Sequence, residues 1–293
     1  MEHKAGFVNI LGNPNVGKST IMNALVGQNL SIITSRAQTT RHRIMGIVNG
    51  ENFQIIYSDT PGIIKPNYKL HESMMKLVNS ALEDADVLLY VTSVDDDVDR
   101  QHDYIQRISR LEIPVILLIN KIDLASTQEE VEALINRWKE RLPGAVTIPL
   151  SAKENFNTGT VFNKVLDLLP EFPPYYSKDA LTDKPERFFA SEIIREKVML
   201  NYRKEIPYSV EIEIEEFKDS TDILRIRAVI HVMRETQKGI VIGKKGTALK
   251  KTGTQARIDL ERFFEKKVFL EMFVKVNKDW RTKEYQLRRF GYR

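Results

Sequence analysis

Two kinds of apolar pattern alternate along the first 170 residues of the chain. Short, almost continuous apolar runs, typical of strands buried on both faces of a sheet, occupy residues 7–11, 44–49, 53–58, 87–92, 115–119 and 146–150. Apolar residues at helical spacing lie between them, near 72–82, 99–111, 128–142 and 156–169. This alternation predicts an α/β domain with a doubly wound, mostly parallel sheet. The turn sequence at residues 49–52 predicts one antiparallel hairpin at the edge of that sheet.

The pattern changes after residue 170. A polar stretch with several prolines at 171–186 predicts a linker with some stiffness. Helical spacing follows at 187–202, and strict alternation at 209–215 predicts a half-buried strand with its acidic residues outward. Further expected elements are strands at 223–233 and 267–276, helices on both sides of Gly243–Gly246, and a basic, aromatic helix at 280–290. We therefore expect a first domain at 1–170 and a smaller α+β domain at 187–293.

Composition narrows the functional classes. The chain has no cysteine, which excludes disulfides, thiolate zinc sites and cysteine nucleophiles and favours a reducing cytosol. It has no run of 18 apolar residues, so we expect no transmembrane helix. The first strand begins almost at the N-terminus, which leaves no room for a signal peptide. The five histidines are scattered without the spacing of metal ligands.

The net charge of +4 conceals an asymmetry. From Arg234 to the end, 17 lysines and arginines stand against 7 acidic residues, whereas the part before Glu186 carries an excess of acid. Such a difference suggests that the C-terminal part meets a polyanion. A basic domain without such a partner remains the alternative.

One stretch carries a phosphate-binding pattern. Residues 12–19 read G-x-x-x-x-G-K-S and lie between a predicted strand and a predicted helix. The two glycines allow a loop whose N–H groups point at one anion, Lys18 adds a charge, and Ser19 offers a hydroxyl to Mg²⁺. The residues expected to contact the nucleotide here are Asn13, Asn15, Val16, Gly17, Lys18, Ser19 and Thr20. This motif predicts a bound nucleoside triphosphate without naming its base.

Two further segments complete the phosphate and metal side of the site. Asp59-Thr60-Pro61-Gly62 follows a predicted strand, so Asp59 can support Mg²⁺ and Gly62 can bring an N–H to the γ-phosphate. In the polar loop before the hairpin we favour Thr40 over Thr39 as a second hydroxyl ligand, because it lies closer to the next strand. The expected metal set is Ser19, Thr40 and Asp59, and the residues expected at the reacting phosphate are Lys18, Thr40 and Gly62.

The base is predicted by two turns that follow strands. In Asn120-Lys121-Ile122-Asp123 the Asp123 carboxylate can accept two hydrogen bonds from guanine, which adenine cannot offer. Asn120 can bridge to the phosphate loop, and the stem of Lys121 can cover the base. In Ser151-Ala152-Lys153 the N–H of Ala152 can bond guanine O6. The sequence therefore predicts GTP and GDP as ligands.

A second glycine motif lies in the basic C-terminal part. In Gly243-Lys244-Lys245-Gly246 two glycines can let the backbone approach a phosphodiester chain while two lysines supply charge. An apolar groove built from Ile240, Val241 and Ile242 could receive unstacked bases, with Lys250 and Lys251 beside it. The order helix, strand, strand, helix, G-x-x-G, helix, strand is that of a type II KH domain, a binder of single-stranded RNA.

Taken together, these motifs resemble one family. Residues 5 to about 170 resemble translation-factor-class GTPases, with all five nucleotide-binding boxes. The whole chain resembles the Era family of bacterial ribosome-assembly GTPases, a TrmE-Era-EngA-type GTPase domain followed by a type II KH domain. The carriers are residues 12–19, 38–41, 59–62, 120–123, 243–246 and 256–281. The resemblance implies binding to the 3′ end of small-subunit ribosomal RNA, a role in assembling that subunit, a monomer in the cytoplasm, and loose contact with the membrane in some members.

The mechanism of hydrolysis stays open at this stage. The position that holds an orienting glutamine in Ras-like enzymes is Ile63 here, which predicts slow intrinsic turnover. One hypothesis is a K⁺ ion near the phosphates, held partly by Asn15 and by the loop at residues 31–40. Arg41 and Arg43 are candidates for an arginine finger or part of a solvated basic face. The alternatives are an RNA-binding scaffold that binds nucleotide without useful hydrolysis, and an ATP-dependent P-loop enzyme.

Overall fold

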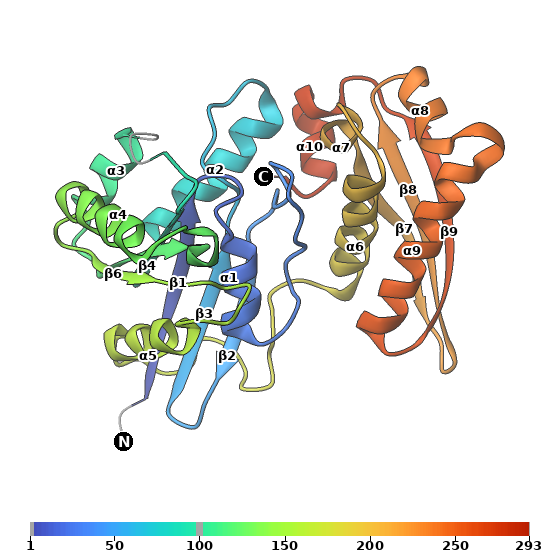
Figure 1. Ribbon diagram of the computed structural model, residues 1–293. Helices are drawn as coiled ribbons and strands as arrows, with labels where there is room; N and C mark the ends of the chain where they lie inside the picture. Colours follow the sequence, from blue (N-terminus) through green and yellow to red (C-terminus); the bar gives the residue numbers. More distant parts are fainter. Residues whose placement is uncertain (1–2, 98–101, 293) are drawn as a thin grey trace. The chain divides into compact units, whose positions relative to one another are not determined.

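The computed structural model describes residues 3–97 and 102–292, and the chain separates into two compact units (Figure 1). The first comprises the chain up to Ser31, Thr40–Pro66 and Met74–Asp183. The second comprises Lys184–Arg293 together with the two short segments Ile32–Thr39 and Asn67–Ser73. None of the helices in these described stretches is long and apolar enough to cross a membrane.

A six-stranded sheet forms the centre of the first unit, in the order β2-β3-β1-β4-β5-β6. All neighbouring strands are parallel except β2 and β3, which form the predicted antiparallel hairpin. The strands are β1 (Lys4–Gly12), β2 (Ile44–Asn49), β3 (Phe53–Asp59), β4 (Val87–Ser93), β5 (Val115–Asn120) and β6 (Val146–Pro149). The doubly wound, mostly parallel sheet predicted from the apolar runs is confirmed.

Helices cover both faces of this sheet (Figure 1). Helices α2 (Lys69–Glu83), α3 (His102–Ile108) and α4 (Gln128–Arg141) pack through Val78, Ile108 and Trp138 against Leu88 and Leu117 of the sheet. Helices α1 (Lys18–Val26) and α5 (Thr158–Leu168) contact each other, and α1 also contacts β1, β2 and β3. A short helical turn, η1 (Ile122–Leu124), follows β5. Residues 99–101 of the helix predicted at 99–111 lie outside the described residues.

The segment predicted to be a linker is packed along the first unit. The backbone N–H of Ile47 on β2 donates to the carbonyl oxygen of Leu181 at 2.8 Å, and Thr182 Oγ1 donates to Met45 O at 2.6 Å. The side chain of Gln54 accepts from the backbone N–H groups of Tyr175 and Tyr176. The segment thus satisfies hydrogen-bonding groups of the edge strand β2, which would otherwise face solvent.

The second unit is built on a three-stranded sheet in the order β7-β8-β9. Strands β7 (Glu211–Asp219) and β8 (Ile223–Val232) are antiparallel, whereas β8 and β9 (Lys267–Val276) are parallel. Its helical elements are α6 (Glu186–Asn201), α7 (Ile206–Ser209), α8 (Glu235–Ile242), η2 (Lys244–Gly246), α9 (Thr247–Phe264), η3 (Trp280–Thr282) and α10 (Glu284–Arg289). This order confirms the predicted KH arrangement.

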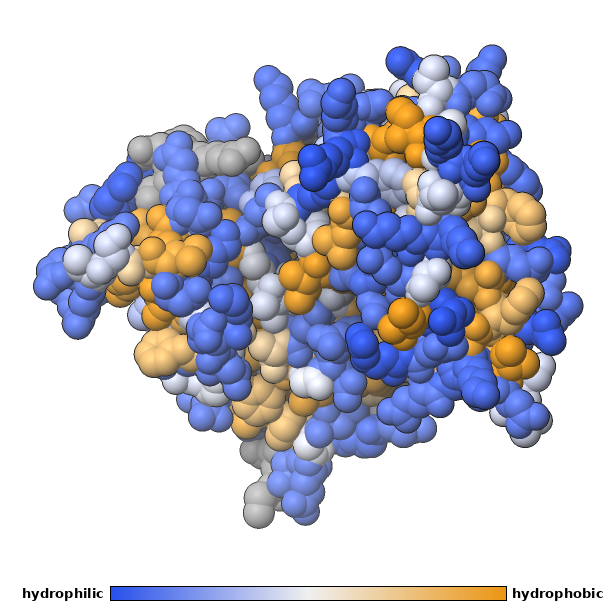
Figure 2. Space-filling view, turned by 45° about the vertical axis from the view of Figure 1, so that its right-hand side comes forward, coloured by the Kyte–Doolittle hydropathy of each residue, from blue (hydrophilic) through white to orange (hydrophobic). Residues whose placement is uncertain are grey.

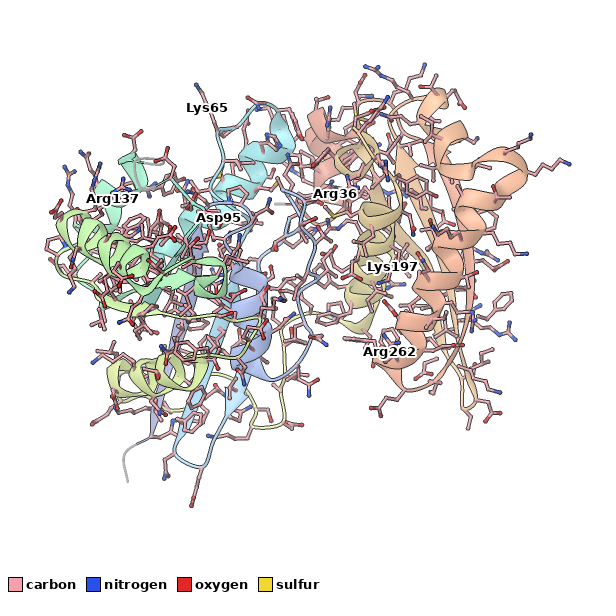
Figure 3. The ribbon with its side chains drawn as sticks, in the orientation of Figure 1. Arg36, Lys65, Asp95, Arg137, Lys197 and Arg262 are labelled. Atoms are coloured by element: carbon pink, nitrogen blue, oxygen red, sulfur yellow. The ribbon has the colours of Figure 1, made fainter. Side chains whose placement is uncertain are left out.

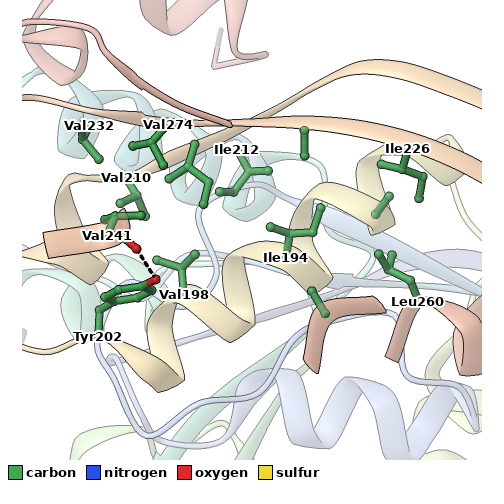
Figure 4. Close-up of a cluster of buried hydrophobic side chains, with 14 of the residues drawn as sticks. Ile194, Val198, Tyr202, Val210, Ile212, Ile226, Val232, Val241, Leu260 and Val274 are labelled. Atoms are coloured by element: carbon green, nitrogen blue, oxygen red, sulfur yellow. Dashed lines mark hydrogen bonds between the residues drawn. The ribbon is translucent and has the colours of Figure 1, made fainter. Parts of the chain in front are cut away.

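The core of the second unit lies between α6, α9 and one face of the sheet (Figure 4). Ile194, Ile226 and Leu260 are each at most 1% exposed within it. Tyr202 carries a polar group into this core, and its hydroxyl donates to the carbonyl oxygen of Val241 at 2.8 Å. The bond satisfies a phenol that burial would otherwise penalise.

Two predictions about the second unit are wrong in detail. Ser209 belongs to α7, so the strand begins later than the alternation at 209–215 suggested. The acidic residues of this strand do not all face solvent: Glu211 is only 5% exposed and accepts from the hydroxyl of Tyr292 at 2.8 Å. Glu213 likewise accepts from Arg289 at 2.6 Å. The C-terminal segment covers this end of the strand, which no local pattern could show.

Candidate functional site

The turn between β1 and α1 has a backbone that its glycines make possible. Gly17, at the start of α1, has φ of 98°, and Asn15 within the turn has φ of 66°. A Cβ on Gly17 would overlap the amide nitrogen Nδ2 of Asn120. Helix α1 has no side-chain cap and no acidic residue in its first turn. Its first N–H groups therefore suit an anion at this end of the helix.

Lys18 lies beneath this turn and is 6% exposed. Its Nζ donates to the carbonyl oxygens of Gly12 at 3.1 Å and Asn13 at 2.8 Å. Burial lowers the pKa of Lys18 to about 8, although the carboxylates of Asp59 and Asp96 act in the opposite direction. A phosphate bound beside Lys18 would supply a nearby negative charge and would stabilise the protonated form of its ammonium group.

Ser19, Thr40 and Asp59 converge as the sequence predicted. Ser19 Oγ donates to Asp59 Oδ2 at 2.7 Å and lies 3.0 Å from Thr40 Oγ1, which is 3.3 Å from the same carboxylate oxygen. Asp59 is fully buried, its other oxygen Oδ1 has no hydrogen-bond partner among the described residues, and burial raises the pKa of this carboxyl. Hydroxyl and carboxylate oxygens are ligands that Mg²⁺ prefers. The orphaned Oδ1 therefore fits a site that a hydrated Mg²⁺ would complete.

The structure separates the two threonines that the sequence left as alternatives. Thr39 Oγ1 lies 2.6 Å from Thr34 Oγ1 and donates to Arg36 O at 2.7 Å. Thr40, by contrast, points its hydroxyl toward Asp59. Thr40 is therefore the residue that the geometry brings to the candidate metal site.

The segment after β3 passes close to the phosphate turn. The N–H of Ile63 donates to Gly12 O at 3.1 Å, and a Cβ on Gly62 would lie 2.8 Å from Pro14 Cα. The side chain of Ile63 is 1% exposed and packs in the apolar cluster with Leu11 and Met75. Gly62 thus approaches the turn with its backbone, while Ile63 points into the core.

Asn120 joins the predicted base-binding turns to the phosphate turn. Its Nδ2 donates to Val16 O at 2.9 Å, and its Oδ1 accepts from the N–H of Ala152 at 3.1 Å. Ser151 Oγ donates to Asp123 Oδ1 at 2.6 Å, which holds that carboxylate in place. The geometry therefore brings together Val16, Asn120, Asp123, Ser151 and Ala152.

Three of the predicted contact residues occupy the rim of the site. Lys121 has φ of 62°, and its Nζ lies 3.1 Å from both carboxylate oxygens of Asp95. Lys153 is 78% exposed at its side chain and pairs with Glu154 at 3.2 Å. Asn15 is exposed at the tip of the phosphate turn. The contacts of these three residues with a nucleotide stay predictions.

Sequence reasoning missed Asp95 and Asp96, which follow β4. Asp96 accepts two hydrogen bonds from Asn13 Nδ2, at 3.1 and 2.9 Å, so it holds the phosphate turn from the side. Asp95, labelled in Figure 3, holds Lys121. A signal was present: an acidic triplet follows the buried run at 87–92, and the carboxyl ends of parallel strands are where ligand sites form.

The view of Arg41 and Arg43 as a solvated basic face is wrong, because they are 0% and 9% exposed. The guanidinium of Arg43 forms a fork with the Asp84 carboxylate at 2.5 and 2.9 Å. It also donates to Ser58 Oγ and Asn9 Oδ1, at 2.5 and 3.0 Å. These bonds commit Arg43 to the fold, which argues against it as a candidate for an arginine finger.

The second glycine motif forms a tight turn between α8 and α9. Gly243, Lys245 and Gly246 have φ of 74°, 51° and 78°. The side chains of Lys244 and Lys245 are exposed, as are those of Lys250 and Lys251 on α9. Like α1, helix α9 begins after a left-handed glycine with no side-chain cap. The turn presents backbone N–H groups and positive charge together, as a phosphodiester chain requires.

A groove of about 380 Å³ lies beside this turn, lined by Gly246, Leu249, Lys250, Gly253, Thr254, Arg257, Leu270 and Met272. Its apolar walls come from α9 and β9 rather than from the predicted residues of α8. Val241 is fully buried in the core and cannot receive a base, which corrects the predicted groove. Ile240 is 51% exposed and Ile242 is half-buried, and their contact with RNA stays a prediction.

Comparison with known proteins identifies both halves. A family model described as a 50S ribosome-binding GTPase matches residues 7–121, and one described as a KH domain matches residues 205–281. The GTPase Era of Ruminiclostridium cellulolyticum is 39% identical over 295 residues, which covers 100% of this chain and 99% of that protein. The GTPase Era of Carboxydothermus hydrogenoformans is 41% identical over the same length and coverage.

Two crystal structures share the complete fold, each with a TM-score of 0.94, 40% identity and 99% coverage of both chains. One is Era in complex with MgGDPNP and nucleotides 1506–1542 of 16S ribosomal RNA. The other is a point variant of Aquifex aeolicus Era bound to GDP and AlF4⁻. The agreement extends over the GTPase part, the KH part and the stretch that joins them. The chain therefore belongs to the Era family of GTPases.

Proposed function

We propose that this chain is a GTP-hydrolysing switch that binds the 3′ end of small-subunit ribosomal RNA and assists the assembly of that subunit. The observation that carries the proposal is the convergence of Ser19, Thr40 and Asp59 beside the buried Lys18. Family membership, and a relative crystallised with GDP and AlF4⁻, support hydrolysis of GTP to GDP and phosphate. A relative crystallised with MgGDPNP and 16S ribosomal RNA supports the ligands.

Guanine is the base that the turns after β5 and β6 favour. Asp123 is oriented by Ser151, so its free lone pairs can accept from guanine N1–H and the 2-amino group. The N–H of Ala152 donates to Asn120 Oδ1 at 3.1 Å, and O6 of guanine would share or replace this acceptor. Adenine would leave the carboxylate without donors, which such sites penalise strongly.

The residues that would hold Mg²⁺ are Ser19, Thr40 and Asp59. A bound Mg²⁺ supplies charge neutralisation for the β- and γ-phosphate oxygens. The chain itself contributes the Lys18 ammonium and the backbone N–H groups of the phosphate turn. The N–H of Gly62 can donate a hydrogen bond to the γ-phosphate. Departure of that phosphate after hydrolysis would break the bond and release the segment that follows Gly62.

We expect slow intrinsic hydrolysis, because Ile63 points into the core and offers no group that orients water. Asn15 lies exposed at the tip of the turn, where it could share a K⁺ ion with the nucleotide. Equal turnover rates in Na⁺ and K⁺ buffers would end the K⁺ hypothesis. An Asn15→Ala variant that keeps a K⁺ preference would assign the ion to other ligands.

RNA binding is assigned to the Gly243–Gly246 turn, the groove beside it and the basic face of α9. Ile32–Thr39, which leads to Thr40, belongs to the same compact unit as these elements, and Arg36 Nη2 donates to Tyr202 O at 2.6 Å. Reordering of this segment by GTP could therefore change how the unit holds RNA. This coupling distinguishes a switch from a simple RNA-binding scaffold.

The decisive experiment measures GTP turnover with and without a single strand that matches the 3′ end of small-subunit ribosomal RNA. A switch gives turnover that this RNA changes, and RNA affinity that differs between the GDPNP and GDP forms. A scaffold gives tight RNA binding with no turnover in either case. Equal competition by ATP and GTP for the site would overturn the guanine assignment and favour an ATP-dependent enzyme.

The cellular setting is proposed on the resemblance alone. We infer a cytoplasmic monomer that works on the small ribosomal subunit and touches the membrane only peripherally. Sedimentation of the purified chain tests the monomer. Flotation with vesicles that contain anionic lipid, in the presence and absence of RNA, tests the membrane contact.

A further inference from the structure

The outer face of β9 carries two exposed aromatic rings that the proposed function does not use. Phe269 and Phe273 are 45% and 46% exposed. Side chains alternate along a strand, so both rings point away from the face on which Leu270 and Met272 pack against the core. Half-exposed aromatic rings on an edge strand favour unwanted association between molecules, and they contribute little to the stability of the folded state.

The C-terminal segment covers only one end of this outer face. Phe290 lies over His231, with ring centroids 5.0 Å apart, and Arg289 holds Glu213. Phe269 pairs in register with Arg225, six residues before His231 on β8. The Phe269 end of the face therefore lies beyond the part that the C-terminal segment covers.

The charges around the two rings favour a polyanion. The Arg225 guanidinium lies 5.3 Å from the centroid of the Phe269 ring, and Lys267 precedes that ring on the same strand. Each acidic residue of the open face is paired with a cation: Glu271 with Arg227 at 3.2 Å, Glu216 with Lys218 at 3.0 Å, and Glu215 with Lys275 at 2.7 Å. Neither Arg225 nor Lys267 forms an ion pair in the described chain, although Arg225 acts electrostatically on Glu216 and Lys267 on Glu261, so both can pair with a phosphate.

The same strand also forms one wall of the groove beside the Gly243–Gly246 turn. Leu270 and Met272 line that groove, and β9 is one of the two edge strands of the sheet. Alternate residues of one strand thus face the groove and the outer face. A G-x-x-G turn clamps about four nucleotides, so a longer strand that leaves the groove meets the two phenylalanines directly around the edge.

We propose that the outer face of β9 is a second RNA contact, on which unpaired bases stack on Phe269 and Phe273. The inference rests on the proposed RNA-binding function and deepens it. The rings are four residues apart, or about 13 Å along the strand, so they would hold two separate bases. Arg225 and Lys267 would meet the phosphates beside the Phe269 base. Stacking accepts any base, so this contact adds affinity and length dependence, while sequence selection stays with the groove. Figure 2 shows one face of the molecule, on which apolar side chains form separate patches within a mainly hydrophilic surface.

The test compares RNA of two lengths on the full chain by fluorescence anisotropy. The short probe is a single strand of about four to six nucleotides from the 3′ end of small-subunit ribosomal RNA, enough to fill the groove. The long probes carry the same core lengthened at the 5′ end or at the 3′ end. One of the two extensions should raise the affinity of the wild type. Phe269→Ala and Phe273→Ala should each weaken that long probe by about 5- to 100-fold and leave the short probe unchanged.

Three controls keep the outcomes distinct. Phe→Tyr variants at the same positions should bind as the wild type, whereas Phe→Leu variants, which keep apolar area but lose the ring, should bind as the alanine variants do. Leu200→Ala removes an apolar side chain that is 53% exposed on α6, and it should have no effect.

If neither extension adds affinity, or if the alanine variants bind the long probe normally, the second contact is refuted and the groove assignment stands. If the wild type binds neither probe, the proposed RNA function itself fails. If the alanine variants alter sedimentation of the chain alone, the face joins two copies of it and the RNA contact is overturned.

Discussion

Replacing Arg43 by methionine should destabilise the first unit strongly and leave the second unit intact. Arg43 immediately precedes β2, three residues after Thr40, and ties the start of that strand to β1, to β3 and to the residue that follows α2. Its side chain is 10% exposed and donates to Asp84, Asn9 and Ser58. Methionine replaces the aliphatic stem of arginine and carries no donors, so it keeps the packing of the stem and removes the hydrogen bonds of the guanidinium group.

The size of the loss in stability depends on which hydrogen-bond partners of Arg43 can be solvated once its guanidinium group is removed. Asn9 and Ser58 are both fully buried, so each polar atom left without a partner costs about 1 to 3 kcal/mol. The Asp84 side chain is 46% exposed and can turn to solvent, so its lost ion pair contributes about 1 kcal/mol or less. The free energy of unfolding of the first unit should therefore fall by about 2 to 7 kcal/mol.

The two tryptophans of the chain allow each unit to be followed separately. Trp138 is buried in the first unit and Trp280 in the second. Urea unfolding of Arg43→Met in a Trp280→Phe background reports the first unit, and the same change in a Trp138→Phe background reports the second. Lys153→Met, which removes an exposed ion pair from the first unit, is the control and should leave both transitions in place. A loss below about 1 kcal/mol in the Trp138 signal, or an equal loss in both signals, would refute the assigned role.

Two further predictions concern the nucleotide turn. Gly17→Ala forces a Cβ onto Asn120 at a left-handed backbone position, so GDP affinity measured by fluorescence titration should fall by about 10- to 100-fold; Gly144→Ala, whose Cβ meets nothing within 4 Å, should bind normally. Burial lowers the pKa of Lys18 to about 8, whereas an unfolded lysine keeps its proton to about pH 10.5, so this residue should make the nucleotide-free protein more stable as the pH rises between these values. For the same reason the protein should take up a proton when it binds GDP at pH 9. Titration calorimetry in two buffers of different ionisation enthalpy would detect this uptake as a difference between the two apparent binding enthalpies. Equal apparent binding enthalpies in the two buffers at pH 9 would contradict it.

Local patterns and long-range contacts explain which features could be predicted. The strand ends, the two glycine turns and the meeting of Ser19 with Asp59 follow from motifs that carry their own geometry. The ties of Asp96 to Asn13 and of Arg43 to Asp84 join residues far apart in sequence, in loops without periodicity, so no local rule reveals them. The position of Glu211 was hidden for the same reason, because it is covered by Tyr292, which lies at the other end of the domain.

Helices α1 and α9 share a feature that ties stability to ligand binding. Each begins after a left-handed glycine, with no side-chain cap and no acidic residue in its first turn. Helix α4, by contrast, is capped by Thr127 and carries Glu129 and Glu130 in its first turn. Acidic residues at a helix start are stabilising, so their absence leaves both candidate phosphate sites open to the negative charge of a ligand.

Placing a negative charge at the start of α9 tests this directly. Thr247 is exposed in the first turn, and Thr247→Glu and Thr247→Gln both remove its hydroxyl bond to Lys244 O, so they differ only in charge. The glutamate variant should stabilise the second unit by about 0.3 to 1 kcal/mol relative to glutamine. It should also bind the single-stranded RNA more weakly at low salt, with a difference that shrinks as salt rises. Changes of the same sign in stability and in affinity would show that no phosphate occupies this helix end.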